Sequence, residues 1–346
     1  MHWPLIKNIP TRMNLKYVRF ALFLGILSVV LCVASLLAAF TGGLRENPIQ
    51  VYQEAEGSPL NRIGVVMSHG FNLGIDFRGG TAVMVEAPDE IDLGALRALA
   101  GRLSEGSVEV QGTSCRPVDA PPYCAMLSFE TGDQGSLVVD NLRQQLGGVI
   151  TGARVINVDV VGSKVSEELF AGGLIALGLA MLLMMVYIWF RFEWQFGLGA
   201  AIGLFHDVIL TLGLFSVMRF EFTLTIIAAL LTIIGYSLND TIVVYDRIRE
   251  NLRKYKKMPL RDLIDLSLNE TLARTIMTGV TTLAALVALL YLGGEALSGF
   301  AIAMIFGILI GTYSSIYVAA PILLLWGVGR SRGGQDKTAP TPQGAR

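Results

Sequence analysis

Long apolar stretches separated by polar segments dominate the pattern of the chain. A hydrocarbon core of about 30 Å needs roughly 20 apolar residues per helix. Six stretches reach that length: residues 20–40, 169–190, 196–218, 222–245, 275–294 and 297–328. The last contains Pro321, which a membrane helix tolerates near an end or at a kink. The pattern therefore predicts six transmembrane helices.

Basic residues flank these spans on alternate sides. Lysine and arginine precede the first span (residues 1–19), lie between the second and third, follow the sixth, and are densest in residues 246–274. The opposite short loops carry only Arg219. Because positive charge marks the cytoplasmic side, we expect both termini inside and residues 246–274 to be a cytoplasmic basic loop. Residues 329–346, rich in Gly, Pro and polar residues, are expected to be a disordered cytoplasmic tail.

The polar block 41–168 then lies outside, and its core, about residues 70–162, has the pattern of a small α+β domain. Strand patterns cover residues 81–87, 108–111, 125–130 and 154–161. One helix pattern carries Leu93, Leu96, Leu99 and Leu103 on one face, and a second helix is suggested by Leu137, Leu142 and Leu146. This strand–helix–strand–strand–helix–strand order is that of the ferredoxin-like fold. The predicted fold class is a membrane all-α bundle of six helices with one external α+β ferredoxin-like domain.

Composition supports a membrane protein. Apolar residues make up 53%, charged residues 16%, and the mean hydropathy is +0.56, which leaves too little polar surface for a soluble globule. The net charge of −1, without a run of like charges, gives no electrostatic footprint for nucleic acid. The first span exceeds a signal-peptide apolar region and lacks a convincing cleavage site, so we expect it to be retained.

Three cysteines are present. Cys32 lies within the first span, whereas Cys115 and Cys124 flank a Pro-rich stretch of the external block. The latter two suit a loop-stapling disulfide outside the cytoplasm. Sequence alone leaves open whether their geometry permits it.

A few ionisable residues interrupt the apolar spans. His206 and Asp207 lie near the middle of the third span, Asn239 and Asp240 in the cytoplasmic half of the fourth, and Arg274 at the start of the fifth. A charge at mid-membrane costs a few kcal/mol, so these residues are functional candidates. Counting about 1.5 Å per residue, Asp240 and Arg274 differ in depth by roughly 8–10 Å, within reach of an arginine side chain.

Further polar residues lie at helical spacing from Asp240 on the fourth span and from Arg274 on the fifth. Tyr236, Asn239 and Asp240 share a face of the fourth span, and Arg274 and Thr278 share one of the fifth. We expect these two polar stripes to face each other. Other interpretations stay open: Arg274 as a snorkelling helix-end residue, and Asp240 as a simple helix–helix hydrogen-bonding group.

Enzymatic and metal sites are not expected. His2 and His69 lie far from His206 in the sequence, so a metal site has too few ligands. Tyr245-Asp246 resembles half of an intramembrane aspartyl protease site, but no Gly-x-Gly-Asp follows, and no nucleotide-binding loop or Ser/His/Asp set occurs.

Several motifs carry a family resemblance. Gly74–Thr81 reads GIDFRGGT and resembles the GIDFxGGT signature of the SecF family. Val161–Leu169 resembles that family's VGPKVxEEL segment, with Ser163 in place of proline. Phe192–Trp194, the His206-Asp207 pair and the run Tyr236–Asn251 match in order, so the resemblance covers about residues 10–321.

The resemblance implies a subunit of the bacterial protein-export machinery. Such a subunit pairs with SecD in the inner membrane, as a member of the RND superfamily. It associates with the SecYEG channel and often with YajC, and uses the proton-motive force to assist translocation and release of unfolded secretory proteins. The family's proton-conducting pair falls on Asp240 and Arg274, with His206 and Asp207 as a second pair. No cofactor is implied, and some relatives couple to sodium ions instead of protons.

The expected mechanism starts at Asp240. Protonation removes its attraction to Arg274, the fourth and fifth helices reorient, and linkers flanking the external domain transmit the motion. The signature residues Gly74, Asp76, Arg78, Gly79 and Gly80 are the expected hinge, although a plain tight turn before a strand explains them as well. Two alternatives stay open: a scaffold that transports nothing, and a homodimeric small-molecule exporter.

Overall fold

Six helices of the described residues are long and apolar enough to cross a membrane. The computed structural model describes residues 15–42, 48–54, 70–104, 108–113, 122–129 and 135–328. The first five spans are α1 (Tyr17–Phe40), α7 (Ser163–Arg191), α8 (Trp194–Met218), α9 (Leu224–Lys254) and α10 (Leu260–Leu292). The protein is thus a multi-pass membrane protein, as predicted. The tail expected to be disordered lies outside the described residues.

The sixth span is not a continuous α-helix. It consists of α11 (Glu295–Ser314), a π-helical turn η2 (Ser315–Ala319) and α12 (Ala320–Trp326). In a regular α-helix, the ring of Pro321 clashes with the carbonyl of Tyr317, four residues earlier. The π-turn contains that carbonyl and widens the helix there. The break therefore follows from the proline near the end of the span.

The α+β unit contains a four-stranded antiparallel sheet in the order β3-β4-β2-β5. Its strands are β2 (Gly80–Ala87), β3 (Val108–Thr113), β4 (Tyr123–Phe129) and β5 (Arg154–Val161), and its helices are α5 (Leu93–Leu103) and α6 (Gly135–Val149). The predicted order of strands and helices is confirmed. Leu96, Leu99, Leu142 and Leu146 are buried in its core, whereas Leu137 is 61% exposed. The reason is its place in the first turn of α6, where Val138 and Val139 face the sheet instead.

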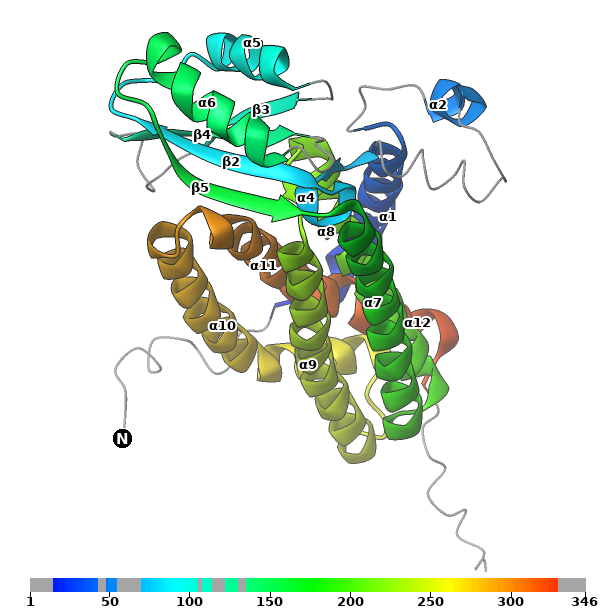
Figure 1. Ribbon diagram of the computed structural model, residues 1–346. Coiled ribbons are helices and arrows are strands. Elements are labelled where there is room, and N and C mark those ends of the chain that lie inside the picture. Colours follow the sequence, from blue (N-terminus) through cyan, green and yellow to red (C-terminus); the bar gives the residue numbers. More distant parts are fainter. Residues whose placement is uncertain are drawn as a thin grey trace, which may run out of the picture.

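Short elements that the sequence pattern did not predict join this unit to the bundle. A parallel pair is formed by β1 (Asn72–Leu73) and β6 (Glu221–Phe222), the latter in the turn between α8 and α9. The single helical turn α4 (Ile75–Arg78) follows β1, and a separate short helix, α2, covers Pro48–Glu54. Figure 1 shows the α+β unit over one end of the membrane helices, with α5 and α6 on the side of the sheet that faces away from those helices.

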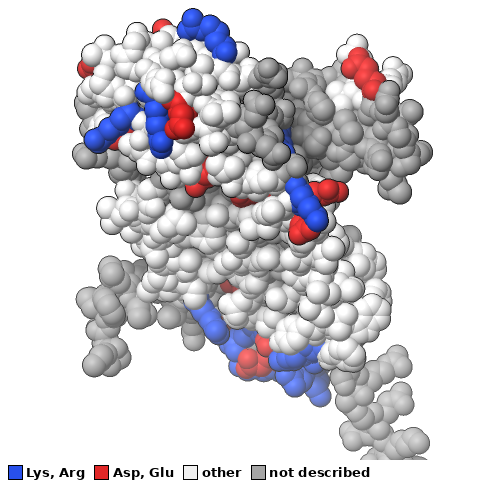
Figure 2. Space-filling model, in the orientation of Figure 1, with Lys and Arg blue, Asp and Glu red and all other residues white. Residues whose placement is uncertain are grey.

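Charged residues are distributed unevenly along the molecule. Figure 2 shows a band over the membrane helices that is nearly free of charged residues, with basic residues gathered at the end opposite the α+β unit. The exposed basic residues of the α9–α10 connection are Arg253, Lys254, Lys256, Lys257 and Arg261.

Helices α8 and α9 form the centre of the bundle. In each, 56% of the most apolar stretch of 18 residues is buried, whereas the buried share is 11% for α1 and 6% for α7. Close contact of α8 with the sixth span depends on Gly199. A Cβ atom there would lie 2.5 Å from the Tyr245 hydroxyl and 3.1 Å from the Ala319 carbonyl oxygen. That hydroxyl donates a hydrogen bond of 3.0 Å to the same carbonyl. Gly199 therefore leaves room for a buried inter-helix hydrogen bond.

Replacing Gly199→Ala is expected to lower the free energy of unfolding by about 1–3 kcal/mol, because the methyl group overpacks this contact. Thermal unfolding of the full chain in detergent, followed by intrinsic fluorescence, measures the change. Gly178→Ala is the matched control, since a Cβ atom at this helical glycine meets nothing within 4 Å. Equal effects of the two substitutions would contradict the role given to Gly199.

Candidate functional site

The predicted carboxylate of α8, Asp207, is buried at the centre of the bundle, with 1% of its surface exposed. Ser237 of α9 and Ser314 at the end of α11 both donate hydrogen bonds to its Oδ2, the latter at 2.9 Å. Its Oδ1 lies 2.9 Å from Nδ1 of His206, the preceding residue. One acid thus holds three helices together.

The predicted carboxylate of α9, Asp240, is 7% exposed and has a similar shell. Thr275 of α10 donates to its Oδ1 at 2.6 Å, and Ser315, the first residue of the π-turn, donates to its Oδ2 at 2.9 Å. Both partners are neutral hydroxyl groups. A hydroxyl can donate to a carboxylate and can also accept from a protonated carboxyl group, so this shell satisfies either charge state.

The sixth span connects the two acids. The consecutive residues Ser314 and Ser315 bond to Asp207 and Asp240, respectively, and Ser237 lies one helical turn before Asp240 on α9. The sequence pattern did not single out Ser237, Ser314 or Ser315. Two adjacent serines in the middle of an apolar span, just before a proline, were the available signal.

The predicted contact between Asp240 and Arg274 is not formed. No ion pair within 4.0 Å joins these side chains among the described residues, and Arg274 is exposed. Thr275, the next residue of α10, occupies the position facing Asp240. Consecutive helical residues point about 100° apart, so a helix that directs Thr275 toward Asp240 directs Arg274 elsewhere. The counted depth of Arg274 does not determine its direction.

The expected face-to-face packing of the two polar stripes is also wrong. Asn239 and Thr278 are exposed and Tyr236 is half-buried, while only Asp240 of this set is buried. The Thr278 hydroxyl donates to carbonyl oxygens of its own helix, those of Arg274 and Thr275. The exposed residues of the stripes, Asn239, Arg274 and Thr278, therefore lie on a surface of α9 and α10 that the described residues leave uncovered. We call this surface the polar face.

His206 lies on the side of the site that α1 closes. Its ring stacks on Tyr313 with centroids 6.0 Å apart. The Tyr313 hydroxyl donates to the carbonyl oxygen of Leu24 at 2.8 Å. The Ser28 hydroxyl lies 2.9 Å from the same Tyr313 hydroxyl. The Nε2 atom of His206 is buried and has no hydrogen-bond partner within the part of the chain that is described. His206 and Asp207 are thus brought together as a pair, as their adjacency suggested.

The signature residues Gly74–Gly80 lie at the N-terminal end of α9, away from the acids. Asp76 Oδ2 accepts a hydrogen bond of 2.8 Å from the backbone N–H of Leu224. Gly74 donates its N–H to the Phe222 carbonyl at 2.9 Å. Gly79 and Gly80 adopt φ values of 75° and 121°, which glycine permits without strain. Arg78 is exposed and lies 3.9 Å from Glu109, a weak surface pair.

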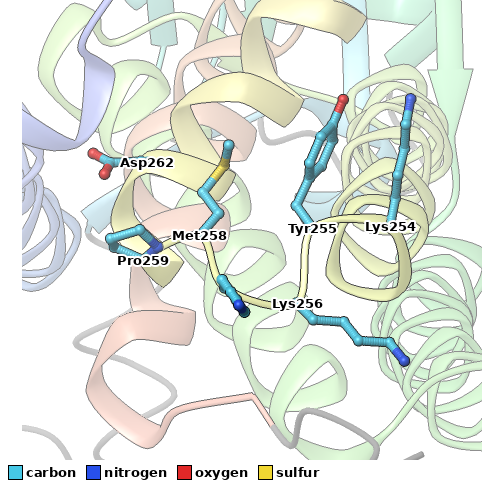
Figure 3. A pocket seen from close by; sticks show the side chains of 7 residues that line it. Lys254, Tyr255, Lys256, Met258, Pro259 and Asp262 are labelled. Carbon is cyan, nitrogen blue, oxygen red and sulfur yellow. The ribbon is translucent and has the colours of Figure 1, made fainter.

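The remaining predicted sites add no chemistry to this cluster. Cys124 is buried in β4 and disulfide-bonded, and its predicted partner Cys115 lies outside the described residues. The residues that the structure describes contain no group of three metal-ligating side chains. A surface hollow of about 660 Å³ lies at the basic α9–α10 connection and is lined by Lys254, Tyr255 and their neighbours (Figure 3). It does not include either buried acid.

Sequence profiles of one family match the chain in two places. Residues 142–329 match the family described as protein export membrane protein SecD/SecF, C-terminal, and residues 65–85 match the SecD/SecF GG motif. The protein translocase subunit SecF of Rhodobacter capsulatus is 46% identical over 277 residues, covering 77% of this chain and 83% of that relative. The SecF subunit of Cereibacter sphaeroides is 44% identical over 279 residues, covering 79% and 85%.

Solved structures of SecDF are similar in fold. The crystal structure of SecDF from Thermus thermophilus, described as a translocon-associated membrane protein, has a TM-score of 0.66 and 27% identity and covers 89% of this chain. SecDF in the super-membrane-facing form has a TM-score of 0.57 and 31% identity and covers 91%. The chain spans only 50% and 39% of those two SecDF chains.

Removing the hydroxyl that Thr275 provides to Asp240 is expected to destabilise the bundle. Thr275→Val keeps the side-chain shape but leaves Asp240 Oδ1 short of a donor, which lowers the free energy of unfolding by about 1–3 kcal/mol. Thr278→Val is the matched control on the same helix and changes it by less than about 0.5 kcal/mol. Denaturant titration in detergent micelles measures both, and a control effect as large as that of Thr275→Val would contradict the role of this hydrogen bond.

Proposed function

Because the chain belongs to the SecF branch of the SecD/SecF family of protein-export membrane proteins, we propose that it uses the proton-motive force, together with SecD, to assist late translocation and release of secreted proteins. Family membership supports the accessory role in Sec-dependent export. Coupling to an ion gradient is the further step, and it rests on the geometry around Asp240. No catalytic role is proposed for any residue.

The observation that carries the proposal is the neutral shell of Asp240. A carboxylate used as a fixed structural charge is usually held by permanent donors or a cation. Asp240 instead has two hydroxyl partners, from α10 and from the sixth span. When the acid gains a proton, its single O–H can donate to only one of them, so one hydrogen bond reverses and the other does not. Each protonation state favours its own arrangement of these helices, so proton binding shifts their relative position.

The polar face supports a partner in the membrane. Asn239, Arg274, Thr278 and Thr281 are exposed on α9 and α10, and an arginine facing lipid costs a few kcal/mol. A second membrane protein that covers this face removes that cost. The SecDF chains, about twice as long as this one, support SecD as that protein. Association with the SecYEG channel and with YajC, and action on unfolded secretory clients, follow from the family resemblance.

We also propose the arrangement relative to the membrane. The α+β unit is a ferredoxin-like domain on the outer face of the inner membrane, and both termini are cytoplasmic. The basic α9–α10 connection at the opposite end of the bundle supports this orientation (Figure 2). A disulfide at Cys124 suits an oxidising compartment.

Asp240→Asn is expected to abolish the increase in export that a proton gradient gives. Asparagine keeps the size of the acid and one acceptor oxygen but cannot bind and release a proton. Export of a secretory precursor into inverted membrane vesicles, with and without the gradient, is the measurement, and the variant should fall to the level seen without it. Asp262→Asn, an exposed carboxylate in the first turn of α10, is the matched control and keeps the full increase.

Two results would contradict coupling. Full gradient stimulation in the Asp240→Asn variant would remove Asp240 from the mechanism. If the unaltered chain increased export equally well without any gradient, that result would favour an assembly scaffold. Substituting a sodium gradient for the proton gradient identifies the coupling ion.

A cysteine at Thr281, on the polar face, is expected to form a cross-link with SecD when the two chains are expressed together. A cysteine at Ile175 of α7 is the control, because this apolar side chain is 68% exposed on a helix that faces away from the acids. Cross-linking in native membranes with a short thiol-reactive reagent, followed by identification of the partner, measures it. Products containing two copies of this chain would favour the homodimeric exporter instead.

A further inference from the structure

The signature segment, residues 70–80, is bound along its length to the outer ends of the membrane helices. Ser216 of α8 donates hydrogen bonds of 2.8 Å to the carbonyl oxygens of both Ala38, in α1, and Gly70. Asn72 Nδ2 donates to the carbonyl oxygen of Arg219 at 3.3 Å. The first part of the segment is therefore fixed to α1 and to the end of α8.

The middle of the segment contacts the turn that leads into α9 through hydrogen bonds and packed side chains. Gly74 and Phe222 share a backbone hydrogen bond next to the β1–β6 pair. A Cβ atom at Gly74 would lie 2.9 Å from both Glu221 Oε1 and Thr223 Cγ2, so a larger residue cannot approach as closely. Phe77 is buried, and its ring centroid lies 5.9 Å from that of Phe222.

The capping of α9 is unusual. Its N-cap residue, Thr223, makes no side-chain capping bond. The N–H of Leu224, the first residue of the helix, instead donates to Asp76, which is 148 residues away in the chain. Free N–H groups and the helix dipole both favour a carboxylate at this end. Asp76 thus performs from another segment the task that an N-cap side chain usually performs locally.

The end of the segment continues directly into the sheet. After the positive φ values of Gly79 and Gly80, the chain becomes β2, which pairs with both β4 and β5. Residues 70–80 therefore connect the first turn of α9 to an inner strand of the α+β unit. Asp240 lies 16 residues beyond Leu224 on the same uninterrupted helix, about 24 Å along its axis.

We propose that residues 70–80 are a latch and that Asp76 is the positioning residue that closes it, so that displacement of α9 passes to the α+β unit through this cap. This inference rests on the proposed function, since it assigns the path by which a proton-driven shift at Asp240 reaches the outer domain. It differs from a flexible hinge, because the glycines here permit close contact and a fixed turn. The path is a hydrogen-bonded, packed junction.

The test compares Asp76→Ala, Asp76→Asn and Asp92→Ala in the full chain, purified with its membrane partner and reconstituted in vesicles. Asp92 caps α5 by accepting from the N–H groups of Gly94 and Ala95, so its substitution removes a cap of the same kind away from the junction. Amide hydrogen exchange of the first turn of α9 measures the latch. Export with and without a proton gradient measures its function.

We expect Asp76→Ala to speed exchange at the start of α9 by about fivefold to tenfold and to reduce gradient-stimulated export by a similar factor. Asp76→Asn, which keeps an acceptor oxygen, restores most of both, and Asp92→Ala changes neither. Faster exchange in Asp76→Ala with export fully retained would overturn the latch while leaving proton coupling at Asp240 intact. Unchanged exchange in Asp76→Ala would overturn it directly. Failure of the gradient to stimulate the unaltered chain would overturn the proposed function, and the exchange data would still test the cap.

Discussion

A carboxylate inside an apolar bundle must obtain its hydrogen bonds from the protein, and this constraint determines the arrangement of the central helices. Asp207 and Asp240 are both buried. Burial of each carboxylate costs several kcal/mol of desolvation free energy unless donors bond to its oxygens. Among the described residues, every serine or threonine whose hydroxyl donates to their carboxylate oxygens belongs to a helix other than the acid's own. The two acids therefore require α8, α9, α10 and the sixth span to lie together.

The irregular sixth span helps both buried acids to obtain hydrogen-bond donors. Two consecutive side chains, Ser314 and Ser315, must reach acids on two different helices. The α-helix ends at the first of these serines and the π-turn begins at the second. A widened turn is tolerated at membrane depth only where neighbouring protein covers it, and Ser315 and Ala319 are completely buried. Pro321 supplies the local cause of the break, and the acids make use of it.

Sequence patterns predicted what depends on local periodicity. The six spans, the order of elements in the α+β unit, and Asp207 and Asp240 as exceptional residues all follow from apolar spacing or from a charge within it. The patterns did not predict the donors, because most hydroxyls in membrane helices resemble that of Thr278, which bonds to its own backbone. For Arg274 they gave no angle around the helix, and Thr275 is the residue that faces Asp240. The β1–β6 pair joins residues 149 apart, and two-residue strands carry no periodicity to detect.

Two sides of α9 differ in their surroundings, and this difference bears on the proposed transmission of movement from Asp240 to the α+β unit. Asp240 is buried within the chain, whereas Asn239 lies on the polar face, where we propose that another membrane protein binds. With that protein bound, contacts on both sides of α9 would oppose rotation of the helix about its axis. The outer end is restrained as well, since the cap of Leu224 belongs to the segment that continues into β2. Under the proposed mechanism, α9 responds to protonation at Asp240 and passes the resulting displacement along its axis to the segment that caps Leu224 and leads into β2.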